Sequence, residues 1–263
     1  MIIRGGNTMT EIVKVKNASY AKYEEALLRK ANLKKEAEQY HISYIREFGD
    51  LIEESFRLKV ECIRKKKEIA FCQRLANMGK PINRNDLIAF IEKEMQQYYD
   101  ELESVIDDVK TAKKSAHVSP MTVKKIKETY YKLAKLIHPD LHPEYAMDDT
   151  IMDYWNRITI AYQYNQAEDM AELEALVKMY LEEEYDGPFD LEITDIDSKI
   201  LKVEEEIESI VSNNPYLYRI ILGSDAAIRE KKKEYQNEIE SFKKYSAQLS
   251  EVLATFETEE MLS

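Results

Sequence analysis

The chain has 263 residues, of which 33% are charged, and it contains only six glycines and six prolines. This dominance of long helix-forming side chains predicts an all-α protein and argues against a strand-rich fold. A net charge of −12 argues against nucleic acid as the main ligand, because phosphate backbones are bound by excess lysine and arginine.

The cysteines and the distribution of apolar residues indicate a compartment. Cys62 and Cys72 lie on one predicted helix, too far apart along its axis to form a disulfide. They indicate a reducing environment and exclude a cysteine-based zinc site within the chain. No apolar run approaches the roughly 20 residues that span a bilayer, and residues 1–17 are expected to be a flexible N-terminus without a signal-peptide pattern. We therefore expect a cytoplasmic protein that has no membrane partner.

Two long helices are predicted first. The first runs over about residues 18–78, and its apolar residues recur at alternating steps of three and four, which indicates one buried stripe: Leu33, Ala37, Tyr40, Tyr44, Phe48 and Leu51. It ends at GKPIN (79–83), where a glycine favours a helix stop and a proline cannot continue the hydrogen-bond ladder. A second helix over about 85–116 repeats the apolar pattern. The short connection predicts an antiparallel hairpin, or coiled coil, over residues 18–116.

The two helices differ in length. The first is about 90 Å long at about 1.5 Å per residue, and the second is roughly half that length. When it folds back from residue 80, the second helix reaches only to about Arg46. The stripe over residues 20–45 then needs another cover, because an isolated amphipathic helix is marginally stable. The C-terminal helices or a second copy of the chain in a homodimer would supply it, whereas a separate hairpin at each end of the chain is the alternative.

The helices predicted in the central segment, over residues 119–185, are shorter than the first two and more often interrupted. Ser119 followed by Pro120 is typical of an N-cap and the first helical position, and the helix that follows is expected to stop at Ile137, just before His138-Pro139. Its apolar face carries Ile126, Tyr130, Leu133 and Ile137, and the opposite face carries Lys124, Lys127, Tyr131, Lys132 and Lys135. A further helix is expected to start near Asp148 and to present Ile151, Trp155, Ile158 and Tyr162 on one face. The two helices should lie antiparallel with these faces together.

The loop between these helices contains His138-Pro139-Asp140. It has three interpretations: a turn that ends a helix, a metal site, or a loop that another protein binds. His138, Asp140 and His142 have a spacing that suits a metal ion in an extended loop, but no fourth ligand accompanies them. In the predicted hairpin the loop lies at one tip, beside the end of the basic helix.

Beyond DGPFD (186–190) a third heptad-like run appears, comprising Ile193, Ile196, Ile200, Val203, Ile207 and Ile210. It stops at SNNP (212–215), and a last helix is predicted over about 225–256. These two helices predict a C-terminal hairpin, again a coiled coil, over residues 191–257.

The run KKIKETYYKLAKLIHPD, followed by WNRITIAYQ, resembles the J-domain of DnaJ-like co-chaperones. His138, Pro139 and Asp140 match the HPD loop of that family. The residues that match its helix-packing pattern are Tyr130, Leu133, Ala134, Trp155, Ile158, Ala161 and Tyr162. The resemblance covers about 60 of the 263 residues and implies a small J-domain-like helical insert, over residues 117–185, between coiled-coil helices.

The chain also departs from the family pattern. The short first helix of the family has no counterpart, and AKKSAHV (112–118) stands in its place, so the end of the second long helix is expected to pack there. Leu141 stands where a lysine or arginine is usual. The segment MAELEALVKMYLEEE (170–184) is acidic where the family is basic, and no zinc-finger, Gly/Phe or C-terminal substrate-binding region is present.

The resemblance implies a co-chaperone that binds a DnaK-type chaperone of the heat-shock-70 class and stimulates its ATPase. Asp140 would bind a partner arginine, and Pro139 would fix the loop that presents it. Lys124, Lys127, Tyr131, Lys132 and Lys135 would face an acidic patch on the chaperone. The coiled coil would target a client protein.

J-proteins catalyse no bond chemistry, so we expect no enzyme activity, no catalytic residue, no metal and no cofactor. No paired carboxylates, nucleophile elbow or glycine-rich phosphate loop argues otherwise. The alternative is a coiled-coil scaffold whose J-like fold is degenerate and does not stimulate a chaperone.

Overall fold

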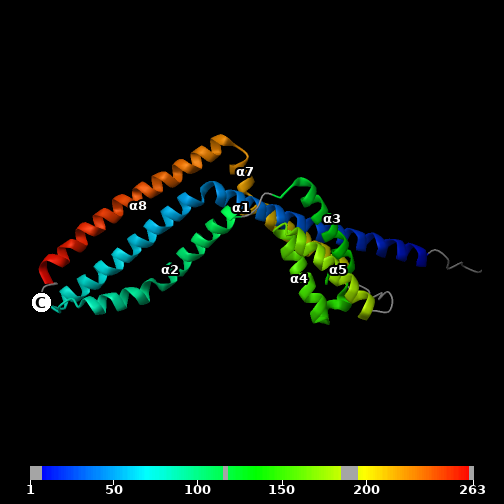
Figure 1. Cartoon of the computed structure of the whole chain (residues 1–263), viewed down its shortest axis with the longest axis horizontal. Coiled ribbons are helices and arrows are strands. Elements are labelled where there is room, and N and C mark those ends of the chain that lie inside the picture. The colour runs from blue at the N-terminus through cyan, green and yellow to red at the C-terminus, as the bar shows by residue number, and fades with distance from the viewer. Residues whose placement is uncertain (1–7, 115–117, 185–194, 261–263) are drawn as a thin grey trace, which may run out of the picture. The chain divides into compact units, whose positions relative to one another are not determined.

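The protein is all-α, as its composition predicts. The computed structural model describes residues 8–114, 118–184 and 195–260, and these contain helices and no strand. In chain order the helices are α1 (Thr8–Asn77), α2 (Arg84–Lys114), α3 (Pro120–Ile137), the 3-10 helix η1 (Pro143–Met147), α4 (Asp149–Gln163), α5 (Ala167–Glu184), α6 (Ile196–Ser212), α7 (Tyr218–Leu222) and α8 (Asp225–Glu260) (Figure 1).

Local sequence signals account for most helix ends. α1 ends before Gly79, which adopts a positive φ of 61°, and α6 ends at Ser212, where the SNNP break begins. α1 begins at Thr8, well before the predicted start near residue 18, because residues 8–17 contain neither glycine nor proline. The predicted end of the second helix near Ala116 and the predicted apolar position Ile193 lie outside the described residues.

The chain divides into two compact units. The first unit comprises residues 1–40 and 116–217, and the second comprises residues 41–115 and 218–263. The two helices of the predicted C-terminal hairpin over 191–257 fall in different units, because α6 belongs to the first unit whereas α7 and α8 belong to the second. Periodicity identified the apolar stripes of α6 and α8, but it could not identify the partner of each stripe.

In the second unit, α2 packs antiparallel to α1. Val109 of α2 packs with Phe48 of α1, whereas the earlier Met95 packs with the later Val60. As the helix lengths predict, α2 reaches Arg46, whose Nε donates to the Ala112 carbonyl oxygen at 2.7 Å. The helices approach closely at Gly49, where an added Cβ would lie 3.1 Å from a methyl group of Val109, so the contact favours glycine within this helix.

α8 also runs along α1 in the second unit, in the parallel direction (Figure 1). The hydroxyls of Tyr44 and Tyr235 lie 2.9 Å apart, and further along both helices Lys65 Nζ donates to Ser246 Oγ at 2.7 Å. Leu249 packs beyond this point with Ile69. The second half of α1 is therefore covered by α2 on one side and by α8 on another.

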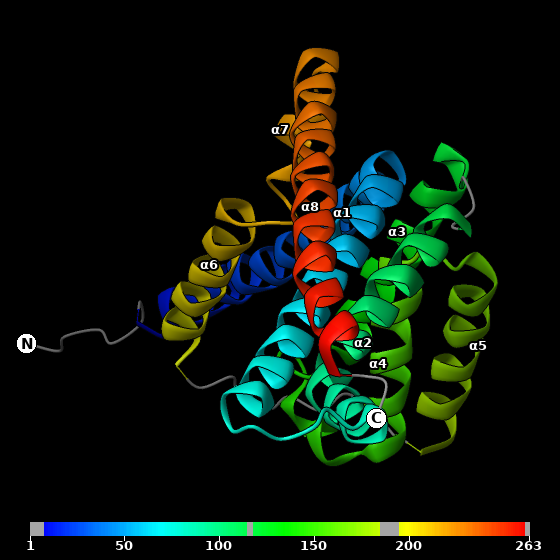
Figure 2. The same ribbon diagram turned by 90° about the vertical axis from the view of Figure 1, so that its left-hand side faces the viewer.

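In the first unit, the early part of α1 is covered by other helices of the same chain. Leu28 and Ala31 pack against the core that α3, α4 and α5 share, and these three helices lie side by side (Figure 2). Tyr23 and Leu27 pack with α6, chiefly with Val203 and Ile207. The stripe that α2 cannot reach is thus buried against the central segment and α6.

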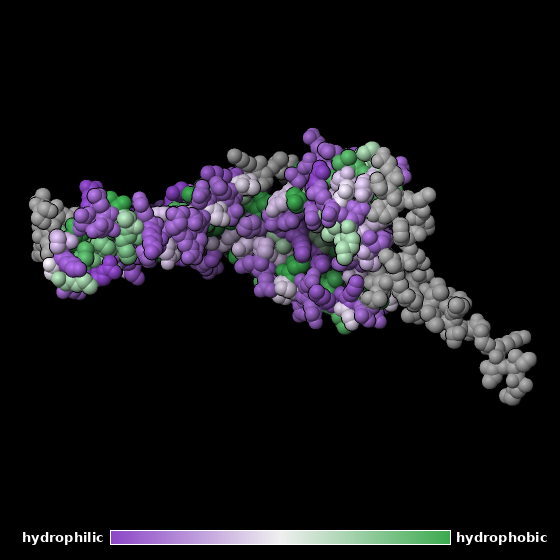
Figure 3. Space-filling view, turned by 90° about the horizontal axis from the view of Figure 1, so that it is seen from below, coloured by the Kyte–Doolittle hydropathy of each residue, from purple (hydrophilic) through white to green (hydrophobic). Residues whose placement is uncertain are grey.

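Hydrophilic residues cover most of the face drawn in Figure 3, with hydrophobic residues scattered between them. None of the described helices has an apolar stretch long enough to cross a bilayer.

Candidate partner-binding site

The basic helix of the central segment is α3, and both of its ends form as predicted. Ser119 Oγ accepts the backbone N–H of Thr122 at 3.1 Å, and Pro120 occupies the first turn. The helix stops at His138, which is extended with φ −61° and ψ 124° because Pro139 follows it. The four residues of the predicted apolar face are all buried: Ile126, Tyr130, Leu133 and Ile137.

α4 packs antiparallel to α3. Asp148 caps α4 by accepting the backbone N–H groups of Thr150 and Ile151, each at 3.0 Å. Tyr130 stacks on Tyr162 near the end of α4, with ring centroids 4.0 Å apart. The residues predicted for the apolar face of α4 are buried in the same core: Ile151, Trp155, Ile158 and Tyr162. α5 completes this core, so the loop after α3 is held by a packed three-helix platform.

The loop is closed onto this platform. The ring centroid of His138 lies 4.5 Å from that of Trp155, and His138 Nδ1 accepts the backbone N–H of Asp140 at 3.0 Å. His142 Nε2 donates to the Lys135 carbonyl oxygen at 2.7 Å. Leu141 is buried against α1 and α6, whereas the Asp140 side chain is exposed. These contacts fix the backbone of the loop and leave the Asp140 carboxylate exposed to solvent.

Electrostatics keep the His138 ring neutral. Burial lowers the pKa of His138 to about 4, against an ordinary value of 6.5, and the positive charges of Lys30 and His142 lower it further, while the Asp140 carboxylate opposes them. The Nδ1 atom accepts a hydrogen bond, so the neutral ring carries its proton on Nε2.

The imidazole of His138 is expected to titrate near pH 4 in an NMR titration, with its signal assigned from the spectrum of His138→Gln. The unfolded chain takes up this proton near pH 6.5, so the stability that neutral His138 contributes is complete above pH 6.5 and is lost as the pH falls toward 4. A midpoint near 6.5 in the folded chain would contradict the buried ring position.

The predicted lysine face is partly engaged by α1. The four lysines Lys124, Lys127, Lys132 and Lys135 are exposed, and Tyr131 is half-buried. Lys135 Nζ lies 2.7 Å from Glu24 Oε1, and the Tyr131 hydroxyl accepts a hydrogen bond from Asn32 Nδ2. The lysine face therefore contacts α1 at the end nearest the loop, whereas Lys124, Lys127 and Lys132 are exposed to solvent.

The helix that packs on this core is not the one expected. The end of α2 packs with Tyr44 and Phe48 in the second unit, whereas α1 supplies the residues that contact the core of α3 and α4. Tyr162 Oη donates to Asn32 Oδ1 at 2.6 Å, so one amide of α1 bonds both helices. Sequence reasoning missed Glu24 and Asn32 because no spacing signal links residues such as Asn32 and Tyr131, which are 99 positions apart.

A pocket of about 250 Å³ lies beside the loop, between α1, α3 and α4. His138, Asp140 and Trp155 line it from the central segment, and Lys34 and Lys35 line it from α1. Lys30 also lines it, with Nζ 2.9 Å from Glu206 Oε2 of α6. The exposed carboxylate of Asp140 therefore lies at a pocket that is also lined by these lysine side chains.

No cluster of three metal-ligating side chains occurs among the described residues. His142 bonds the end of α3, and the His138 ring packs on Trp155, so the loop is not extended as a metal-binding HxDxH pattern requires. The interpretation of the loop as a metal site therefore has no geometric support.

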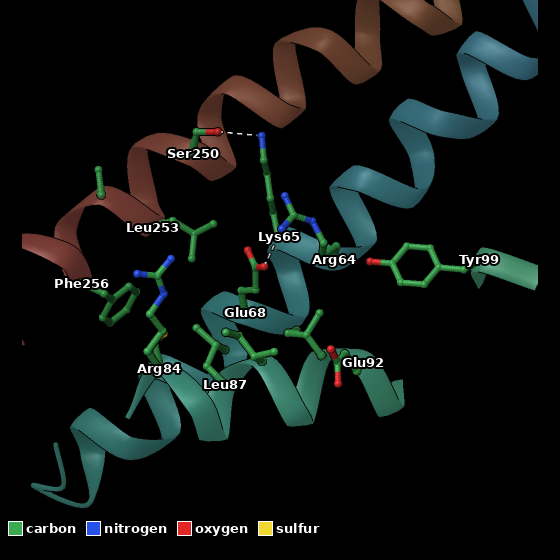
Figure 4. A pocket seen from close by; sticks show the side chains of 14 residues that line it. Arg64, Lys65, Glu68, Arg84, Leu87, Glu92, Tyr99, Ser250, Leu253 and Phe256 are labelled. Atoms are coloured by element: carbon green, nitrogen blue, oxygen red, sulfur yellow. Dashed lines mark hydrogen bonds and ion pairs between the residues drawn. The ribbon is translucent and has the colours of Figure 1, made fainter. Parts of the chain in front are cut away.

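A larger pocket, of about 730 Å³, lies between α1, α2 and α8 of the second unit (Figure 4). Lys65 reaches across to Ser250 of α8 at 2.8 Å, and Arg64 pairs with Glu68 at 3.0 Å. Leu87 and Phe256 supply apolar lining. Lys65 thus links α1 to α8, whereas the Arg64–Glu68 pair lies within α1, and none of the sequence-predicted site residues lies here.

No family model, curated protein or solved structure matches the chain. The functional conclusion therefore depends on the loop at residues 138–140 and on the helices that hold it. Their arrangement can present a carboxylate and several ammonium groups to a protein partner.

Proposed function

We propose that this protein is a J-domain co-chaperone that binds a DnaK-type chaperone and stimulates its ATPase. The observation that carries the proposal is the exposed Asp140 carboxylate, set on a loop that the Asp140 N–H to His138 bond and Pro139 hold in one conformation. A rigid loop of this kind loses little conformational entropy on binding, which favours recognition by a partner.

The charged residues have separate roles in this proposal. Asp140 forms a charge-assisted hydrogen bond with a partner arginine. Lys124, Lys127 and Lys132 face an acidic surface and mainly raise the rate of encounter. Lys135 and Tyr131 are engaged by Glu24 and Asn32, so α1 flanks the docking face and contributes to its shape.

The second unit supplies the targeting function in this proposal. Its helices α1, α2 and α8 expose a mixed charged and apolar surface that would bind a client protein, as coiled-coil helices commonly do. Both cysteines are buried and neither forms a disulfide, which suits the reducing environment of the cytoplasm, where we place the protein.

The alternative is a scaffold whose J-like segment does not stimulate a chaperone. The contacts of α1 with Tyr131 and Lys135 favour it, because they engage part of the face that a chaperone would use. Buried Leu141 favours it too, since the chain lacks a basic residue directly after the loop.

Single-turnover ATP hydrolysis by a DnaK-type chaperone distinguishes these functions. The native chain is expected to accelerate hydrolysis, and Asp140→Asn is expected to abolish that acceleration, because the neutral amide cannot form the charged bond with arginine. The control is Asp153→Asn, an exposed aspartate of α4 that is not among the predicted docking residues, which should stimulate like the native chain. Equal rates with and without the native chain would favour the scaffold instead.

A further inference from the structure

A second pocket of the first unit, of about 310 Å³, lies between α1, α3 and the turn that joins α4 to α5. Lys35 and Tyr162 line both this pocket and the pocket beside the loop. Two buried polar atoms without a hydrogen-bond partner belong to residues that line it, and among the described residues no other buried side chain has such an atom. Because buried polar atoms are nearly always hydrogen-bonded, two unsatisfied atoms at one pocket indicate a binding site.

The first of these atoms is Lys35 Nζ. The residue is only 8% exposed, and its ammonium lies 4.0 Å from the centroid of the Tyr162 ring. Burial lowers the pKa of Lys35 to about 8, and the neighbouring Lys127 ammonium adds to the shift. A buried cation without an anionic partner is costly, and a bound anion would remove that cost.

The second atom is Asn165 Oδ1. Asn165 sits in the turn with φ 56°, and its backbone N–H points to the Tyr162 carbonyl oxygen at 3.4 Å, so the turn holds the residue at the pocket. A buried amide oxygen favours a ligand that offers an N–H or O–H donor. The nearby side-chain amide of Asn32 is already hydrogen-bonded to both Tyr131 and Tyr162. It lines the pocket and is not one of the groups that would bind the ligand.

These groups together select a ligand class. A ligand needs an anionic oxygen for the ammonium groups of Lys35 and Lys127 and a donor for Asn165 Oδ1. Acetate has no donor, and the phosphate dianion would be repelled by the Glu36 carboxylate, which also lines the pocket. A zwitterion satisfies all four groups, because its ammonium suits both Asn165 and Glu36.

We propose that this pocket binds a free α-amino acid, with the carboxylate on Lys35 and Lys127 and the ammonium on Asn165 and Glu36. The volume accommodates an amino acid with its side chain. The proposal does not depend on chaperone binding, although Lys127 also belongs to the predicted docking face.

Isothermal titration calorimetry of the full chain with each of the twenty common L-amino acids tests the proposal. At least one is expected to bind with a stoichiometry of one, and more tightly than sodium acetate or inorganic phosphate. Lys35→Met is expected to weaken that binding at least tenfold. Its matched control is Lys34→Met, which alters a neighbouring lysine that lines only the pocket beside the loop.

A second variant keeps the test decisive if Lys35→Met fails to fold. Asn165→Gly removes the amide and tolerates the positive φ, so it should fold and should weaken amino-acid binding while acetate binding stays unchanged. Absence of binding by all twenty amino acids, binding unaffected by both variants, or phosphate or acetate binding as tight as that of every amino acid would overturn the proposal.

Discussion

Leu133→Ala is expected to lower the free energy of unfolding of the first unit by about 2–5 kcal/mol. Leu133 is fully buried in the core where α3 meets α4 and α5, and the truncated side chain would leave a cavity there. Urea unfolding followed by the fluorescence of Trp155 measures the effect, because this single tryptophan lies in the same core.

The matched control is Leu136→Ala on the same helix. Leu136 is 41% exposed, so its truncation should change the free energy of unfolding by less than about 0.5 kcal/mol. Equal effects of the two substitutions would contradict the orientation of α3. That orientation also directs the predicted lysine face away from the core, so the same result would undermine the docking face.

Phe48→Ala is expected to lower the free energy of unfolding of the second unit by about 3–5 kcal/mol. The Phe48 ring is fully buried between Tyr44, at 4.6 Å between centroids, and Tyr235 of α8, at 6.1 Å. Val109 of α2 packs in the same cluster, so this one side chain contacts the helices on both sides of α1.

Amide hydrogen exchange measures the effect of Phe48→Ala where it should occur. Protection is expected to fall in α2 and α8, because local opening of the unit becomes more frequent when its core is weakened. Ile220→Ala is the control, since Ile220 is a large apolar residue of α7 in the same unit but is 64% exposed. Unchanged protection around Val109 in Phe48→Ala would contradict the shared cluster.

Much of the fold and part of the candidate site could be predicted from local patterns. Pro120 and Pro139 mark the two ends of α3 because proline restricts its own backbone and that of the preceding residue. The alternating apolar steps identified which side of each helix is buried, as Tyr130 and Trp155 illustrate. The loop at residues 138–140 could also be placed at the tip between two antiparallel helices.

Other features depended on pairing between distant segments. The early part of α1 packs on α3, α4 and α6, and α8 packs parallel to α1. Helices with similar apolar stripes can pair in many ways. Only the total apolar surface that the folded chain buries selects among these pairings. The engagement of Lys135 by Glu24 follows from that selection.

The burial of Lys35 could not be predicted from local patterns, because a lysine on a charged helix is expected to be exposed to solvent. Its burial follows from the packing of Tyr162 over the same stretch of α1, which excludes water from the ammonium. The amino-acid sequence by itself determined which residues form helices and which faces are apolar, because these depend on neighbours a few positions away. Only the tertiary structure decided which faces meet, because that choice depends on contacts between residues about a hundred positions apart, such as Asn32 and Tyr131.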